Sequence, residues 1–143
     1  MPQTIIPDAV SRQSLVTVHP GDSVRAVVHL MTKRHIGAVP VVDADGTLAG
    51  IFTERDVMCR VVDRDLDPHD TTIGQVMTAA PTTATPDWPI LKALEHMADG
   101  GYRHLPVVED GRLVAIVSIR DLYAAVTGKL EDDILALSSS GVV

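Results

Sequence analysis

The hydrophobic positions of this chain follow one order, and that order occurs twice. In each half, a short extended piece precedes a stretch with apolar residues at helical spacing, and two short apolar runs and a second helical stretch follow. The first helical stretch depends on Val24, Val27, Val28 and Met31, and its counterpart depends on Ile90, Ala93, Leu94 and Met97. The pattern predicts a β-α-β-β-α unit that is used twice.

The strands are predicted from short runs rich in Val and Ile. In each half two such runs flank an Asp-Gly turn, which is typical of a β-hairpin. The predicted hairpin strands are Ala38–Val42 with Leu48–Phe52 and Leu105–Val108 with Leu113–Val117, and the extended pieces are Leu15–Val18 and Thr82–Thr85. Closing helices are predicted at Glu54–Val62 and Arg120–Thr127, and helical turns that introduce the two units are predicted at Ile5–Val10 and Thr71–Met77.

A direct comparison of the two halves supports a duplication. A shift of 66 residues superimposes the run Pro-Val-Val at 40–42 on the same run at 106–108. After one residue is dropped at the Asp45 turn, a shift of 65 residues superimposes the Arg-Asp pair at 55–56 on the pair at 120–121. One supersecondary unit is therefore used twice, and a site built by one copy is expected in the other.

The length of 143 residues suits one domain. Each copy alone would bury too little surface, so the copies are expected to share a core. Hydrophobic residues make up 45% of the chain and aromatic residues only 3%, which favours an aliphatic core of helices on small sheets. We expect the first repeat at residues 5–66, the second at 71–127, and a C-terminal helical extension and tail at 128–143.

The predicted extension carries apolar residues on one helical face, at Leu130, Ile134 and Leu137. Nothing in the repeats requires this piece, so it is expected to cover a hydrophobic edge or to contact a partner subunit. The tail from Ser138 to Val143 is expected to be disordered.

The charge of the chain disfavours several classes of partner. A formal net charge of −7 and a pI near 5.2 argue against binding to nucleic acid or to an anionic membrane. No apolar run approaches the ~20 residues that span a bilayer, and no signal-peptide pattern precedes the first unit, so a soluble cytoplasmic protein is expected. The single cysteine, Cys59, is expected to be a buried thiol that acts as a small hydrophobe.

Two tetrapeptides are the candidates for chemistry, Thr53-Glu54-Arg55-Asp56 and Ser118-Ile119-Arg120-Asp121. One interpretation is structural, because a Thr or Ser followed three residues later by an acid resembles a capping box, worth ~1 kcal/mol per helix. The other interpretation is a nucleotide site. A helix N-terminus with a hydroxyl and an Arg favours phosphate, and an Asp carboxylate can accept hydrogen bonds from a ribose diol.

No enzyme motif is recognisable. The six histidines lack the spacing of an HExxH site, and the chain has neither a Cys-x-x-Cys pair nor a Walker loop. The acidic residues Asp63, Asp65, Asp67 and Asp70 are best interpreted as a solvated linker rather than as a metal site. We therefore expect no catalysis, no metal and no required cofactor.

The segments IGAVPVVDADGTLAGIFTERD and YRHLPVVEDGRLVAIVSIRD, with the run GQVMT between them, resemble a tandem cystathionine β-synthase (CBS) domain pair over nearly the whole chain. The resemblance implies an α+β module in which two CBS units pack sheet to sheet with pseudo-twofold symmetry. It also implies two clefts that bind adenosyl ligands such as AMP, ADP, ATP, NAD or S-adenosylmethionine. AMP, ADP or ATP is the expected ligand, and the resemblance implies a homodimer with a regulated protein partner.

Carried onto this sequence, the resemblance makes Asp56 and Asp121 ribose ligands and places phosphate near the neighbouring hydroxyl and Arg residues of both tetrapeptides. Adenine would lie against the extended pieces and the first strands, where backbone groups at Thr17, Val18, Thr83 and Ala84 could bind the base edge. Arg103 and His104 would reach phosphate across the module. The implied ligand-binding residues are Thr17, Val18, Ile36, Ala38, Val39, Pro40, Thr53, Arg55, Asp56, Thr83, Ala84, Tyr102, Arg103, His104, Leu105, Pro106, Ser118, Arg120 and Asp121.

The two copies differ where selectivity would be set. Copy two has Tyr102-Arg103-His104 where copy one has Ile36-Gly37-Ala38, and Ile119 replaces Glu54. Copy two is therefore expected to be the better-occupied site. Two function classes remain: a sensor that transmits ligand binding to a partner, and a structural dimerisation module with vestigial, unoccupied clefts.

Overall fold

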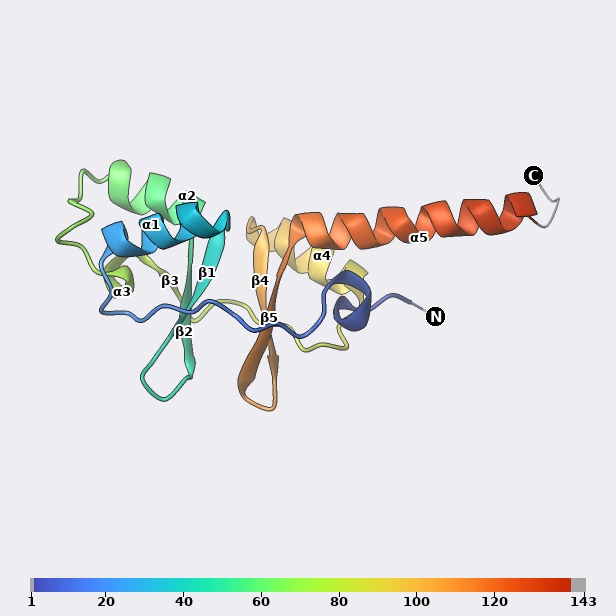
Figure 1. Ribbon diagram of the computed structural model, residues 1–143, viewed down its shortest axis with the longest axis horizontal. Helices are drawn as coiled ribbons and strands as arrows, with labels where there is room; N and C mark the ends of the chain where they lie inside the picture. The colour runs from blue at the N-terminus through green and yellow to red at the C-terminus, as the bar shows by residue number, and fades with distance from the viewer. Residues whose placement is uncertain (1, 140–143) are drawn as a thin grey trace.

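The structure, a computed structural model, describes residues 2–139 and confirms two mixed α/β repeats (Figure 1). The first repeat contains α1 (Val24–Arg34), β1 (Ala38–Val42), β2 (Leu48–Thr53), α2 (Glu54–Asp56) and its continuation η2 (Val57–Val62). The second contains α4 (Ile90–Gly100), β4 (His104–Glu109), β5 (Arg112–Ser118) and α5 (Ile119–Ser139). Three short elements complete the chain: η1 (Ile5–Ala9), α3 (Ile73–Val76) and β3 (Thr78–Ala79).

The two hairpins have equivalent registers. Pro40 lies opposite Ile51 in the first, and Pro106 lies opposite Ile116 in the second. Each predicted extended piece adds an isolated parallel bridge to the first strand of its hairpin, Val18 to Val41 and Ala84 to Val107. The hairpins stand side by side in the middle of the molecule (Figure 1). The helices of the first repeat lie to the left of them in this view, and the helices of the second repeat lie to the right.

The introductory turns are exchanged between the repeats, which the sequence did not predict. η1, expected to introduce the first repeat, packs on the second, where the Ile5 N–H donates to the Trp88 carbonyl (3.0 Å). α3 packs on the first repeat, where the Ile73 N–H donates to the Asp22 carbonyl (2.9 Å). The chain therefore crosses between the repeats twice, and each crossing ties one unit to the other.

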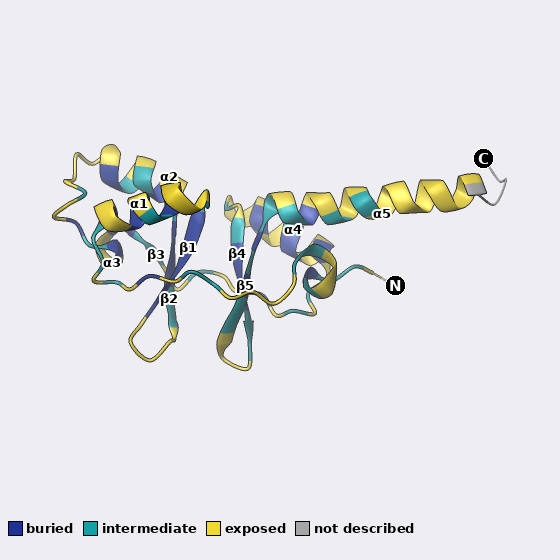
Figure 2. Cartoon of the chain, viewed as in Figure 1, coloured by how far each residue is buried: buried dark blue, intermediate teal, exposed yellow. Residues whose placement is uncertain are grey.

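The buried residues form two clusters, one in each repeat, rather than the single shared core that we expected. Figure 2 shows burial concentrated in the strands and on the inner sides of the helices. The first cluster includes Phe52 and Ile73, and the second includes Ile5 and Leu122. Because Ile5 and Ile73 come from the exchanged turns, each core is completed by a segment adjacent to the other repeat.

α5 is one continuous helix of 21 residues, although the sequence indicated two pieces separated near Gly128. Its C-terminal half projects beyond the second repeat (Figure 1) and is exposed (Figure 2). Of the predicted disordered tail, Ser138 and Ser139 belong to this helix and residues 140–143 lie outside the described residues. No helix within residues 2–139 has the length and hydropathy of a membrane span.

Cys59 is exposed on η2, so the expectation of a buried thiol was wrong. Val61 instead occupies the core side of this helix, and Met58 and Val62 are exposed with Cys59. The apolar run of η2 is therefore continuous around the helix rather than confined to one buried face.

Candidate functional site

A cleft of about 720 Å³ lies between the repeats and is lined by both of them. The first repeat and its extended piece contribute Gln13, Ser14, Leu15, Val16, His35, Ile36, Gly37, Ala38, Pro40 and Glu54. The second repeat contributes Arg103, His104, Ile116, Ser118, Ile119, Arg120 and Asp121. The first strand of one copy thus faces the helix start of the other, whereas the sequence suggested that each copy would build its own site.

The start of α5 is fixed in the cleft by three hydrogen bonds. The Ile119 N–H donates to the Arg103 carbonyl (2.9 Å). The Ser118 N–H donates to Asp121 Oδ2 (2.9 Å), and the Asp121 N–H donates to Ser118 Oγ (3.1 Å). These last two bonds are a capping box, so the structural interpretation of this motif is correct. The cap also orients Asp121, because the bonds hold its carboxylate beside the helix N-terminus.

The lining of the cleft includes an apolar group and a charged or polar group of residues, which we call its apolar side and its charged side. The apolar group comprises Leu15, Val16, Ile36, Pro40 and Ile116. The charged or polar group includes Glu54, Arg103, His104, Arg120 and Asp121. A ligand with a flat apolar part and a polar or anionic part would match this division, because such sites combine apolar walls with a few oriented polar groups.

His104 lies on the charged side and is half-buried in the cleft. Burial lowers the pKa of its imidazole below the ordinary value, while the carboxylates of Glu54 and Asp121 oppose this effect and Arg103 adds to it. The imidazole is therefore neutral at neutral pH, and the fixed cations of the cleft are the two arginines.

Glu54 brings a negative charge into this cleft from the first repeat. In the sequence, the replacement of Glu54 by Ile119, which removes a negative charge, is one reason to expect copy two to be the better-occupied site. That argument was wrong, because the cleft that contains Asp121 is lined by Glu54 and Ile119 together. The charged side is consequently mixed rather than purely cationic.

The equivalent tetrapeptide in the first repeat has a different environment. Thr53 and Asp56 form the same capping box, with the Thr53 N–H donating to Asp56 Oδ2 (3.0 Å). The other carboxylate oxygen of Asp56 lies 3.5 Å from Arg60 Nε and 3.4 Å from the Thr78 hydroxyl. Asp56 is only 7% exposed, and these neighbours cover it.

The two arginines of the tetrapeptides also differ. Arg55 Nη1 donates to the Gly101 carbonyl (2.8 Å), so this guanidinium links the first repeat to the end of α4. Arg120 is exposed and lines the cleft. Only the second of these arginines is therefore directed at the open cleft.

Eight of the predicted site residues come together in the cleft: Ile36, Ala38, Pro40, Arg103, His104, Ser118, Arg120 and Asp121. Thr53, Arg55 and Asp56 lie at the start of α2 instead, and Thr17 and Thr83 are exposed in the extended pieces. Val18, Val39, Ala84, Leu105 and Pro106 are buried.

Two of the predicted base contacts are already used within the fold. The Val18 N–H donates to the Pro40 carbonyl (3.1 Å), and the Ala84 N–H donates to the Pro106 carbonyl (2.9 Å). These donors cannot bind a base edge without breaking the bridge between the extended piece and the sheet. Tyr102, expected beside Asp121, packs against the buried core of the second repeat.

Several lining residues are not predicted by the sequence motifs, above all Gln13 to Val16 and Glu54. The segment from Gln13 to Val16 precedes the residues that the resemblance indicated and lies where the chain crosses between repeats. The Gln13 N–H donates to the Val114 carbonyl of β5 (2.9 Å), and Val18 then joins β1. Only the exchange of the introductory turns brings this segment to the cleft, and no local sequence signal indicates that exchange.

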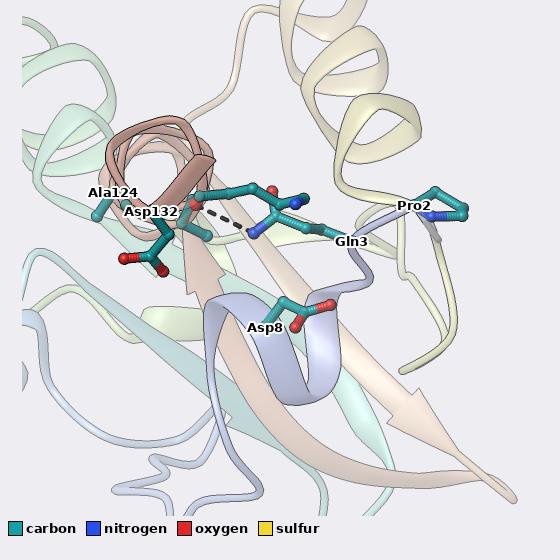
Figure 3. Close-up of a pocket in the computed structure, with 8 residues that line it drawn as sticks. Pro2, Gln3, Asp8, Ala124 and Asp132 are labelled. Carbon is teal, nitrogen blue, oxygen red and sulfur yellow. Dashed lines mark hydrogen bonds between the residues drawn. The ribbon is translucent and has the colours of Figure 1, made fainter. Parts of the chain in front are cut away.

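A second hollow of about 500 Å³ lies between the N-terminal segment and α5 (Figure 3). Pro2, Gln3, Asp8, Ala124 and Asp132 are among its lining residues, and Gln3 Nε2 donates to the Ala125 carbonyl (3.1 Å). None of the predicted site residues lines this hollow. Within residues 2–139, no group of three or more His, Cys, Asp or Glu side chains is arranged to hold a metal ion.

Comparisons with known proteins agree on one family for this chain. A family model described as CBS domain matches residues 8–63 and 73–128. The CBS domain-containing protein CBSCBSPB2 of Arabidopsis thaliana is 36% identical over 113 residues, which cover 78% of this chain and 21% of that protein. The chain therefore spans about a fifth of the length of this relative.

Solved structures agree with the fold. A protein with CBS domains from Burkholderia ambifaria MC40-6 superimposes with a TM-score of 0.81 at 32% identity, over 87% of this chain and 93% of that chain. CBSX2 in complex with AMP superimposes with a TM-score of 0.69 at 24% identity, over 82% of this chain and 90% of that chain. At this identity the second likeness supports the fold alone.

Proposed function

The chain belongs to the CBS domain family, and from this premise we propose that it is a non-catalytic regulatory module that binds an adenosyl ligand in the cleft between its two repeats. The observation that carries the proposal is the cleft of about 720 Å³ with Asp121 at its edge. CBSX2, which has the same fold, is described in complex with AMP. For this chain we propose AMP, ADP or ATP, with NAD and S-adenosylmethionine as other members of the same ligand class.

The division of the cleft supports an adenosyl ligand. Adenine would pack on the aliphatic side formed by Leu15, Ile36 and Ile116, and the ribose diol would donate hydrogen bonds to Asp121. Phosphate would lie near Arg120 and the N-terminus of α5, where the helix dipole favours an anion. One molecule would thus satisfy the apolar and charged sides together.

Binding in this cleft would be transmitted because both repeats line it. A ligand that contacts β1 of one repeat and α5 of the other can alter how the repeats pack, to the extent that its affinity differs between the two arrangements. We propose that a protein partner responds to this change. The alternative, a structural module with vestigial clefts, requires that this cleft stay empty.

Thermal unfolding with adenosyl compounds distinguishes these functions. We expect AMP, ADP or ATP to raise the melting temperature, because a ligand at ~100 times its Kd adds ~2.7 kcal/mol to the free energy of unfolding. Inorganic phosphate and guanosine monophosphate are the controls for phosphate and base. No shift with any adenosyl compound at millimolar concentration would favour the structural module.

We also propose that the chain forms a homodimer through α5. Tyr123, Val126, Leu130 and Ile134 follow each other at helical spacing along one side of this helix, and Tyr123, Leu130 and Ile134 are 56%, 59% and 51% exposed. A continuous apolar stripe of this kind is typical of an interaction surface, and a twofold axis lets one stripe cover its own copy. Native mass spectrometry should give two subunits for the natural chain and one for the double variant Leu130→Glu, Ile134→Glu.

A further inference from the structure

We infer that Arg60 pairs with the carboxylate of Asp56, which would otherwise bind ribose in the first repeat. Each chain would therefore bind one adenosyl ligand rather than two. The inference rests on the function proposed above and concerns the site equivalent to the open cleft. By the sequence repeat, that site would use Asp56 as the open cleft uses Asp121. The two carboxylates have the same backbone setting, and the difference lies in what surrounds them.

Asp56 already has the partners that a ribose would need to replace. Arg60, one helical turn later, places Nε 3.5 Å from Asp56 Oδ1, and the Thr78 hydroxyl lies 3.4 Å from the same oxygen. Oδ2 accepts the Thr53 N–H and lies 3.2 Å from the Thr53 hydroxyl. Both oxygens are therefore engaged, and a ribose diol would have to displace an attached cation whose effective concentration at the carboxylate is high.

Arg60 is held in this position from its other side. Its Nη1 donates to the Met77 carbonyl (2.8 Å), at the residue directly before β3. β3 pairs with β2 and supplies Thr78, so the strand and the arginine cover Asp56 together. The guanidinium thus bridges a buried carboxylate and a backbone carbonyl, which is an arrangement that orders its long side chain.

The second repeat lacks both of these partners. The residue four positions after Asp121 is Ala125, which has no charge to offer. The segment that crosses beside β5 carries Arg12, and its Nη2 binds Glu109 at 2.7 and 2.9 Å on the surface. Oδ2 of Asp121 accepts the Ser118 N–H, and no cation pairs with Asp121 in the described part of the chain.

The neighbouring arginines reinforce the difference. Arg55 is bound to the Gly101 carbonyl across the repeats, whereas Arg120 lines the open cleft. In the first repeat, the cation that would meet phosphate and the acid that would meet ribose are thus both engaged by the protein itself. In the second repeat both face the cleft.

The test is the number of AMP molecules bound per chain, measured by calorimetry on the full chain. We expect one for the natural protein and two for Arg60→Met, which keeps the aliphatic part of the side chain and removes the charge. Arg64→Ala is the matched control, because it removes an exposed cation from the turn that follows η2 and should leave one site. The double variant Arg60→Met, Asp121→Ala should bind one AMP at the first repeat.

Three results would overturn the inference: two molecules on the natural chain, one molecule on Arg60→Met, or none on the double variant. If Arg60→Met unfolds, Thr78→Val combined with Arg60→Lys weakens the same contacts and should also add a site. A natural chain that binds no adenosyl compound would overturn the proposed function itself. If the natural chain binds AMP, the proposed function stands, and the stoichiometries of the variants then test the inference alone.

Discussion

Asp56 and Asp121 lie in the first turns of α2 and α5 with the same capping geometry, yet within residues 2–139 Asp56 forms an ion pair and Asp121 does not. Arg60 and Thr78 cover Asp56, which is 7% exposed, whereas Asp121 is half-buried at the edge of an open cleft. A duplicated motif therefore indicates an equivalent backbone, but it does not indicate an equivalent site. The neighbours contributed by the next helical turn and by the crossing segments decide whether the carboxylate is available.

The largest expected effect separates the two aspartates. Asp121→Ala should weaken AMP binding by about 100-fold or more, because hydrogen bonds to a charged group contribute ~1.5–3 kcal/mol each and the ribose would lose two of them. Asp56→Ala should change the affinity by less than about twofold, since Asp56 is engaged within the protein. Isothermal titration calorimetry measures both, and equal losses would mean that the sites are misassigned.

Stability provides the control for this pair of variants, because each aspartate also caps a helix. Loss of a cap costs about 1 kcal/mol, which applies to both. Asp56→Ala should be the more destabilising of the two, because it also leaves Arg60 without its carboxylate. In urea unfolding at pH 7, Asp56→Ala should therefore lose more free energy of unfolding, whereas in calorimetry Asp121→Ala should lose more AMP affinity. If the same variant is the more affected in both experiments, the comparison is contradicted.

The next effect concerns the strand that covers Asp56. A Cβ at Gly50 would lie 2.7 Å from Met77 Sδ and 2.7 Å from the Thr78 carbonyl oxygen, so β3 must move in Gly50→Ala. Overpacking of this kind costs about 1–3 kcal/mol of stability. The equivalent residue in the second repeat is Ala115, which is fully buried, and among the described residues its sheet contains only β4 and β5. Gly21→Ala, where a Cβ would meet nothing within 4 Å, is the control.

Melting temperature and denaturant unfolding should both record this difference. Gly50→Ala should lower stability, and Gly21→Ala should change it by less than about 0.5 kcal/mol. If the two variants are equally stable, then close approach of β3 is not what requires glycine at position 50.

A third variant transfers the partner of Asp56 to the open cleft. Ala125→Arg places a cation four residues after Asp121, as Arg60 is placed after Asp56. Ala125 lines the hollow of about 500 Å³ beside the N-terminal segment, so the longer side chain has space. We expect AMP affinity to fall about tenfold or more, which corresponds to ~1.4 kcal/mol.

Ala125→Met is the matched control for size without charge. It should retain affinity within about twofold, and a loss equal to that of Ala125→Arg would show that bulk rather than charge closes the site. Thermal unfolding of both variants checks that α5 stays in place.

The sequence predicted the elements well because their signals are local. Asp-Gly turns and Val-rich runs located both hairpins to within a residue or two, and Ser23, a residue type that favours the N-cap, caps α1 by accepting the Ala26 N–H at 3.1 Å. The two-residue strand β3 has no local sequence signal. Its pairing with β2 depends on the glycine at position 50, which lies far from β3 in the sequence.

The set of residues that line the cleft was less predictable, since it depends on how the two repeats are placed against each other. The repeat indicates which positions of the two copies are equivalent, but the cleft combines Leu15 and Glu54 from the first half of the chain with Asp121 from the second. Arg60 could have been found from sequence. Its spacing of four residues from Asp56 allows an ion pair on a helix, and the aligned position in the second copy is Ala125.

The smallest expected effect uses His104, whose equivalent in the first repeat is Ala38, so that only the open cleft has an imidazole at this position. Burial lowers the pKa of His104 in the native protein. As the pH falls below about 6.5, the unfolded chain binds a proton that the native imidazole resists, so the unfolded state binds more protons and the free energy of unfolding decreases. Stability from this group is therefore present above that pH and is lost as the pH falls toward the lowered native pKa.

Between pH 7.5 and 5.5, the free energy of unfolding of His104→Asn should consequently decrease less than that of the natural chain. Urea unfolding measures this difference, provided that the two proteins have equal m values. A bound phosphate would favour the imidazolium, so AMP should bind more tightly at pH 6 than at pH 7.5 and the variant should lose this dependence. The two measurements test different parts of the comparison. An unchanged stability difference would mean that burial does not keep His104 neutral, and an unchanged affinity profile would mean that phosphate lies away from the second repeat's helix start.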